Sequence, residues 1–148
     1  LPNAKDFKPA DLGQAVDNLL VIVGRYFDPQ YYSRSSLLIW LPLFETMLLD
    51  ETFRQKLYAR DEEYIGDFAV HIGHVIKFRQ LDLDPRTVSR NLMSYMDGLW
   101  LRWCHSDRKD TRAEQRATLE YLQWQLGSLN ATRQTSEFPD VPRPDAEA

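Results

Sequence analysis

Apolar residues recur at helical intervals along most of this 148-residue chain, and no stretch alternates apolar and polar residues as a half-buried strand would. Asp11, Asp50 and Asp84 each precede a helical pattern, and aspartate is a preferred N-cap. Thr111 and Glu114 match the two ends of a capping box. These signals predict an all-α fold of five to six helices, with the last two long and antiparallel.

The composition divides the chain into three parts. Residues 1–11 contain two prolines and scattered polar residues, which predicts an irregular lead-in. Residues 12–130 hold the helical patterns and are expected to form one domain with its own core. Residues 131–148 are polar and contain three prolines, so we expect a mobile tail without a packed core.

The most apolar stretch is residues 37–49, where apolar side chains surround the expected helix on all sides. A helix of this kind is usually buried on every side, so we expect it in the middle of the domain. Pro42 lies within the stretch and is expected to kink the helix. The stretch is too short to cross a membrane.

Residues 95–103 form a second informative stretch, in which Asp97 and Gly98 interrupt a run of aromatic and aliphatic side chains. Glycine costs roughly 1 kcal/mol in a helix interior relative to alanine, so its presence suggests that another group approaches closely there. An aspartate in such apolar surroundings needs a partner or contact with water. The stretch therefore predicts a close approach at Gly98 and a specific environment for Asp97.

Residues 97–102, Asp-Gly-Leu-Trp-Leu-Arg, resemble the C-terminal domain of TetR-type transcriptional regulators, in particular its BetI-like branch. The apolar helix with residues 37–44 and a closing helix over 111–129 fit the same family. The resemblance covers residues 12–130 and implies an effector-binding and dimerisation domain whose last two helices form a dimeric four-helix bundle. It also implies a helix-turn-helix DNA-binding domain, which has no counterpart in this chain. Because the chain begins at Leu1, we expect it to be a fragment of a longer protein.

The last two helices are expected to make two kinds of contact. Two apolar stripes run along the helix that contains residues 95–103, and only one of them can face the domain interior. By the resemblance, the other stripe belongs to an exposed apolar edge that pairs with a second copy of the chain, to give a homodimer. We assign to this edge Leu92, Met96, Leu99, Trp103, Leu122 and Leu126.

Aromatic side chains are frequent in the helical patterns, and cages of aromatic rings attract quaternary ammonium groups. Asp97 could balance the charge of such a cation, and the BetI-like resemblance also suggests choline. The same residues would suit a flat or apolar effector. The residues assigned to this small-molecule pocket are Trp40, Phe44, Phe68, Tyr95, Asp97 and Trp100.

Two other functions remain open from the residues alone. One is a helical interaction scaffold with a filled interior and no small ligand. The other is a metal protein, because imidazole and carboxylate groups at helical spacing can ligate a divalent ion. Contacts between carboxylates and histidines on a polar surface explain that spacing equally well. The residues concerned are Glu63, Asp67, His71 and His74.

Charge and cysteine content narrow the functional classes further. The net charge of −4 and the sequence pI of about 5.4 argue against a nucleic-acid surface, so any DNA contact is expected from the missing domain. Cys104 is the only cysteine, which excludes an internal disulfide and suggests a reducing, cytoplasmic setting. No nucleophile, phosphate loop or acid–base pair is found, so we expect neither an enzyme, nor a cofactor, nor a membrane partner.

Overall fold

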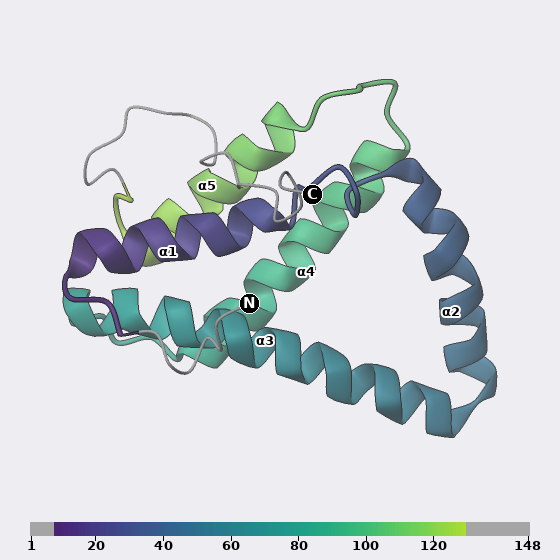
Figure 1. Cartoon of the computed structure of the whole chain (residues 1–148), viewed down its shortest axis with the longest axis horizontal. Coiled ribbons are helices and arrows are strands. Elements are labelled where there is room, and N and C mark those ends of the chain that lie inside the picture. The colour runs from purple at the N-terminus through teal and green to yellow at the C-terminus, as the bar shows by residue number, and fades with distance from the viewer. Residues whose placement is uncertain (1–7, 130–148) are drawn as a thin grey trace, which may run out of the picture.

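The computed structural model describes residues 8–129 of the chain. Within them it contains five α-helices and one short 3₁₀ helix, so the all-α prediction is confirmed. The predicted lead-in over 1–11 lies mostly outside the described residues, and the predicted tail over 131–148 lies entirely outside them. In chain order the elements are α1 (Leu12–Arg25), η2 (Arg34–Ser36), α2 (Leu37–Leu49), α3 (Glu51–Arg79), α4 (Pro85–Cys104) and α5 (Arg112–Leu126) (Figure 1).

Three helices begin where the sequence places an aspartate cap. The side chains of Asp11, Asp50 and Asp84 each accept a hydrogen bond from the backbone N–H three residues later, at 2.8 to 2.9 Å. Each bond satisfies one of the N–H groups that the first turn of a helix leaves without an intrahelical acceptor. These predictions are confirmed, and they depend only on residues within one helical turn.

The start of α5 differs from the predicted capping box. Thr111 precedes the helix, but its side chain makes no capping hydrogen bond. Glu114 is buried, and its carboxylate accepts a hydrogen bond from the guanidinium of Arg108 in the preceding loop. The capping-box prediction is therefore wrong, because the arginine engages the glutamate that would have reached back to the helix start.

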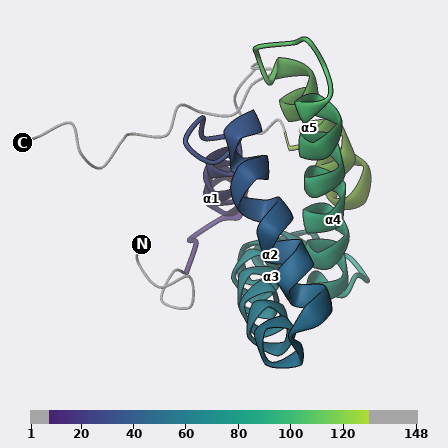
Figure 2. The ribbon, with the colours of Figure 1, turned by 90° about the vertical axis from the view of Figure 1, so that its right-hand side faces the viewer.

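The main hydrophobic core lies between α1, α3, α4 and α5. Leu19 and Val23 of α1 pack there with Ile72 of α3, and all three side chains are fully buried. Figure 2 shows α4 and α5 running together on one side of the molecule. These two helices close the core with Val88, Leu92, Met96, Leu122 and Leu126.

A second, smaller cluster of buried side chains joins the segment after α1 to the end of α4. It consists of Phe27, Tyr32, Trp103 and Cys104. The rings of Tyr32 and Trp103 lie with their centroids 5.1 Å apart, in a tilted arrangement. This cluster anchors the chain just before η2 and α2 begin, so it sets the direction in which α2 leaves the core.

α2 is not in the middle of the domain, and that prediction is wrong. No residue of α2 is buried, and Leu38 and Leu48 are 77% and 80% exposed. In Figure 1 the helix runs along one edge of the molecule and meets the start of α3. The apolar periodicity predicted this helix and its tendency to be buried. It could not show which sides of the helix the chain would cover, and residues 8–129 cover only one of them. Among these residues no helix has the length and apolar character needed to span a membrane.

Gly98 lies inside α4 and faces open space. No atom of the described chain lies within 4 Å of the position that a Cβ atom would take there, apart from the helix's own nearby backbone. The predicted close approach at Gly98 is therefore wrong for packing within the protomer. The helix carries the roughly 1 kcal/mol cost of this glycine without a reason in the protomer core.

Candidate functional site

The hydroxyl of Tyr26 donates a hydrogen bond to Oδ1 of Asp97, which joins the end of α1 to the middle of α4. Burial raises the pKa of Tyr26 far above its usual value, and the charge of Asp97 raises it further, so the phenol stays protonated. Burial also raises the pKa of Asp97, and the Tyr26 hydrogen bond only partly offsets this effect. Asp97 keeps contact with solvent as well. It therefore has the specific partner that the sequence suggested.

A second carboxyl group, that of Asp61 in α3, lies near this pair. Its pKa is raised first by burial and then by the negative charge of Asp97. Two carboxylates that repel each other each become harder to ionise, and a nearby cation relieves that repulsion. Asp61 therefore lies within the electrostatic range of Asp97.

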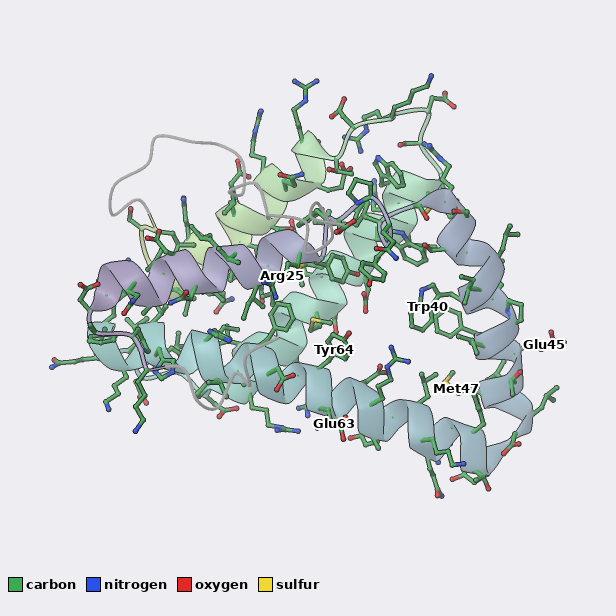
Figure 3. The ribbon with its side chains drawn as sticks, in the orientation of Figure 1. Arg25, Trp40, Glu45, Met47, Glu63 and Tyr64 are labelled. Atoms are coloured by element: carbon green, nitrogen blue, oxygen red, sulfur yellow. The ribbon has the colours of Figure 1, made fainter. Side chains whose placement is uncertain are left out.

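α2 turns one partly buried side toward α3 and α4. On this side Trp40 stacks on Phe44, with ring centroids 6.0 Å apart and ring planes at 29°. Figure 3 shows Trp40 and Met47 pointing toward α3 and α4, whereas Glu45 points away from them. Two of the six predicted ligand residues thus lie together on α2, with Trp40 half-buried and Phe44 44% exposed.

Trp100 follows Asp97 by three residues and so lies close to the same face of α4. Its ring packs against the cluster that contains Phe27 and Trp103. Its indole N–H is buried and has no hydrogen-bond acceptor in the part of the chain that the structure describes. A buried donor without an acceptor costs about 1–3 kcal/mol, so a ligand oxygen or a water molecule would be favourable here.

The two remaining ligand candidates lie elsewhere. Phe68 is buried in the main core between α1, α3, α4 and α5. Tyr95 lies on the α5 side of α4, where its ring stacks on Tyr121 at 4.8 Å. The structure therefore brings together Trp40 with Phe44 and Asp97 with Trp100, while Phe68 and Tyr95 belong to other surroundings.

Sequence reasoning missed Tyr26 and Asp61 as neighbours of Asp97. Tyr26 is 71 residues away from Asp97, and no local spacing rule connects residues so far apart. Asp61 lies in a run of charged residues that reads as an ordinary solvated helix face. The one available signal was the embedded aspartate itself, which called for a partner without saying which.

The weak metal candidates do not converge. Glu63 and Asp67 are exposed on α3, His74 is half-buried, and His71 is buried at 5% exposure. Each step of four residues turns about 40° beyond a full helical turn, so His71 faces the core while Glu63 faces solvent. Among residues 8–129 no three histidine, cysteine or carboxylate side chains are placed to hold a metal ion together.

The sequence profile of the BetI-type transcriptional repressor C-terminal domain matches residues 15–126, from the first turn of α1 to the last residue of α5. The chain belongs to this family. No solved structure matches it. The family is one of transcriptional-regulator domains rather than enzymes, and TetR-family regulators typically dimerise and bind effectors. The resemblance seen in residues 97–102 is confirmed.

The edge assigned to dimerisation from the sequence of this BetI-type domain is not exposed. The prediction is wrong because α1, α3 and the Tyr32–Trp103 cluster cover that side of α4 and α5 within the protomer. Leu99 is half-buried. The other five side chains are buried: Leu92, Met96, Trp103, Leu122 and Leu126.

The opposite side of the α4–α5 pair carries exposed aromatic and aliphatic side chains. Trp124 is 79% exposed and lies beside Tyr121, with ring centroids 6.4 Å apart. Tyr95 stacks on the other side of Tyr121, and Leu101 is also exposed. We call Tyr95, Tyr121 and Trp124 the outer aromatic face.

Proposed function

We propose that this chain is the effector-binding and dimerisation domain of a TetR-type repressor. In this proposal a small molecule binds between the inner side of α2 and the Asp97–Trp100 face of α4. Its binding changes the affinity for DNA of a helix-turn-helix domain elsewhere in the parent protein. The observations that carry the proposal are the exposed carboxylate of Asp97, the Trp100 indole three residues later on α4, and the side of α2 with Trp40 that is turned toward α4.

The chemistry of these groups favours a cationic effector such as choline. Indole faces attract quaternary ammonium groups, and each such contact contributes about 0.5–2 kcal/mol depending on desolvation. Asp97 and Asp61 supply negative charge whose mutual repulsion a cation would relieve. The indole N–H of Trp100 has no acceptor within residues 8–129 and is available to a ligand oxygen, such as a hydroxyl.

The outer aromatic face is the proposed contact with the second protomer. Exposed tryptophan and tyrosine side chains are typical of the centres of protein interfaces. Gly98 lies on α4 between Tyr95 and Leu101 and leaves room for close approach of a partner helix. This role would explain a glycine that the protomer alone does not require.

The proposed mechanism needs only a modest coupling energy. In this mechanism the regulator has one geometry that fits its operator DNA and one that does not. The effector must bind the second geometry more tightly than the first. A coupling of about 1–3 kcal/mol changes DNA affinity by about 5- to 150-fold. With α4 and α5 held at the dimer face, α2 is the element least fixed by burial and therefore the one that an effector moves most easily.

Isothermal titration calorimetry with choline tests this proposal. Choline is expected to bind the wild-type chain. Asp97→Asn should weaken binding by about tenfold or more, because a lost contact of ~1.4 kcal/mol corresponds to that factor. Asparagine keeps an oxygen that can accept the Tyr26 hydrogen bond, so the fold is preserved. Asp67→Asn removes an exposed charge elsewhere on α3 and is expected to leave binding unchanged.

The same titration should depend on pH in one direction. Choline keeps its charge at every pH, whereas protonation neutralises Asp97, so affinity falls as the pH falls through the raised pKa of Asp97. The loss therefore begins at a higher pH than for an ordinary aspartate, and the Asp97→Asn variant shows less of it. If Asp97→Asn and Asp67→Asn bind choline equally well, or if neither they nor the wild type bind it, the cationic site proposed here is wrong.

A further inference from the structure

Arg34 links the segment just before α2 to the far end of α4. Its Nε atom donates a hydrogen bond to the carbonyl oxygen of Cys104 at 3.3 Å. Its Nη2 atom donates to the carbonyl oxygens of Ser106 at 2.5 Å and Arg108 at 2.7 Å. The guanidinium also lies over the ring of Trp103, 4.6 Å from its centroid. One side chain thus contacts three backbone carbonyls and one indole.

One of the carbonyls that Arg34 contacts lies at the end of α4 and needs a donor. The last carbonyl groups of a helix have no intrahelical partner and carry its negative dipole end, so a cation is favourable there. Cys104 is the last residue of α4, and Ser106 and Arg108 belong to the loop that leads to α5. An arginine can hold several such oxygens at once because its donors form a rigid planar fork.

The same loop is held from its other end by groups that touch the Arg34 site. The indole N–H of Trp103 donates to the carbonyl oxygen of Asp110, two residues before α5, at 2.9 Å. Arg108, whose carbonyl Arg34 contacts, donates through its guanidinium to the buried carboxylate of Glu114 in α5. The position of Arg34 therefore bears on both the end of α4 and the first turn of α5.

Arg34 is joined to α2 through η2. It is the first residue of η2, which runs directly into α2 at Leu37. The side chain of Ser33 caps η2 by accepting a hydrogen bond from the N–H of Ser36. The hydroxyl of Ser36 donates to the carbonyl oxygen of Tyr31 at 2.7 Å. The backbone N–H of Leu37, the first residue of α2, donates to the carbonyl oxygen of Arg34, so a displacement of α2 moves Arg34 with it.

We propose that Arg34 is a positioning residue that transmits displacement of α2 to the α4–α5 pair. The inference rests on the proposed function, in which an effector displaces α2 and the dimer contact lies on α4 and α5. It goes beyond that function because it names the connection between the two. When α2 shifts, the Arg34 fork pulls on the end of α4 and on the α4–α5 loop.

Nuclear magnetic resonance of the full chain tests this connection without any effector. Leu43→Ala trims the inner side of α2 and serves as the perturbation. The readouts are the indole N–H signal of Trp103 and the amide exchange rates of residues 105–111. With Arg34 present, Leu43→Ala should shift the Trp103 signal and raise these exchange rates by about tenfold, which corresponds to a local cost of ~1.4 kcal/mol.

The same perturbation is then repeated in an Arg34→Lys background, which keeps the charge but loses the fork. In this background, adding Leu43→Ala should change neither the Trp103 signal nor the loop exchange rates relative to the Arg34→Lys single variant. Arg34→Gln provides a second background, in which the same result is expected. The control is Arg116→Lys on the exposed side of α5, a background in which Leu43→Ala should still shift the Trp103 signal and raise the loop exchange rates.

Two results would overturn the proposal. In the first, Leu43→Ala leaves the Trp103 signal and the loop exchange rates unchanged although Arg34 is present. In the second, Leu43→Ala changes them equally when Arg34 is replaced. If Arg34 only stabilises the loop, its replacement changes the exchange rates of the loop but not the response of these rates to Leu43→Ala. Because choline is absent from the experiment, a failure here leaves the proposed effector site standing, and a failure of choline binding leaves this connection standing.

Discussion

Replacing Trp124 with arginine is expected to convert the proposed dimer into a monomer at micromolar concentration. Trp124 is 79% exposed in the protomer and belongs to the outer aromatic face with Tyr121 and Tyr95. A tryptophan at the centre of an interface typically contributes about 2 kcal/mol or more, so the dissociation constant should rise by about 30-fold or more. Sedimentation equilibrium measures this change directly.

The matched control for this experiment is Tyr58→Arg. Tyr58 is also an exposed aromatic residue, but it lies on α3, away from α4 and α5. Both variants should keep the helical circular dichroism of the wild type, because neither side chain belongs to a core cluster. If Trp124→Arg and Tyr58→Arg dimerise with the same dissociation constant, the outer aromatic face is not the dimer contact.

Leu122→Ala should act on the fold rather than on the proposed dimer contact. Leu122 has no exposed surface and lies in the core between α1, α3, α4 and α5. Truncation of a buried leucine leaves a cavity and costs about 2–5 kcal/mol, so the free energy of unfolding should fall by that amount. Urea unfolding at one fixed protein concentration measures it, since the stability of a dimer depends on concentration.

Glu120→Ala, two residues away on the exposed side of α5, is the control for Leu122→Ala. Its free energy of unfolding should stay within about 0.5 kcal/mol of the wild type, as is usual for surface substitutions. If Leu122→Ala has the free energy of unfolding of the wild type but a weaker dimer, Leu122 belongs to the dimer interface, as the sequence predicted.

Features that depend on one helical turn could be predicted from the sequence. The aspartate caps of α1, α3 and α4 require only a side-chain oxygen and an N–H three residues later, and all three are present. The family also followed from a short segment, residues 97–102. Periodicity places helices reliably because their burial pattern repeats along the chain itself.

Features that depend on which surfaces meet could not be predicted in the same way. α2 is apolar all round, yet nothing in its pattern says which sides the rest of the chain will cover. α4 and α5 each carry two candidate faces, and periodicity alone does not show that the face with Leu92 and Leu122 is buried while the face with Trp124 is exposed. The Tyr26–Asp97 contact, on which the candidate site depends, joins residues that only the fold brings together.

The indole N–H signals of the four tryptophans give the most direct test of the proposed effector site. Trp40 and Trp100 flank the proposed site, Trp103 donates to the carbonyl of Asp110, and Trp124 lies on the outer aromatic face. In a choline titration followed by heteronuclear magnetic resonance, the signals of Trp40 and Trp100 are expected to move most, with Trp124 unaffected. If only the Trp124 signal moves, or if no indole signal moves at saturating choline, the effector does not bind between α2 and α4 as proposed.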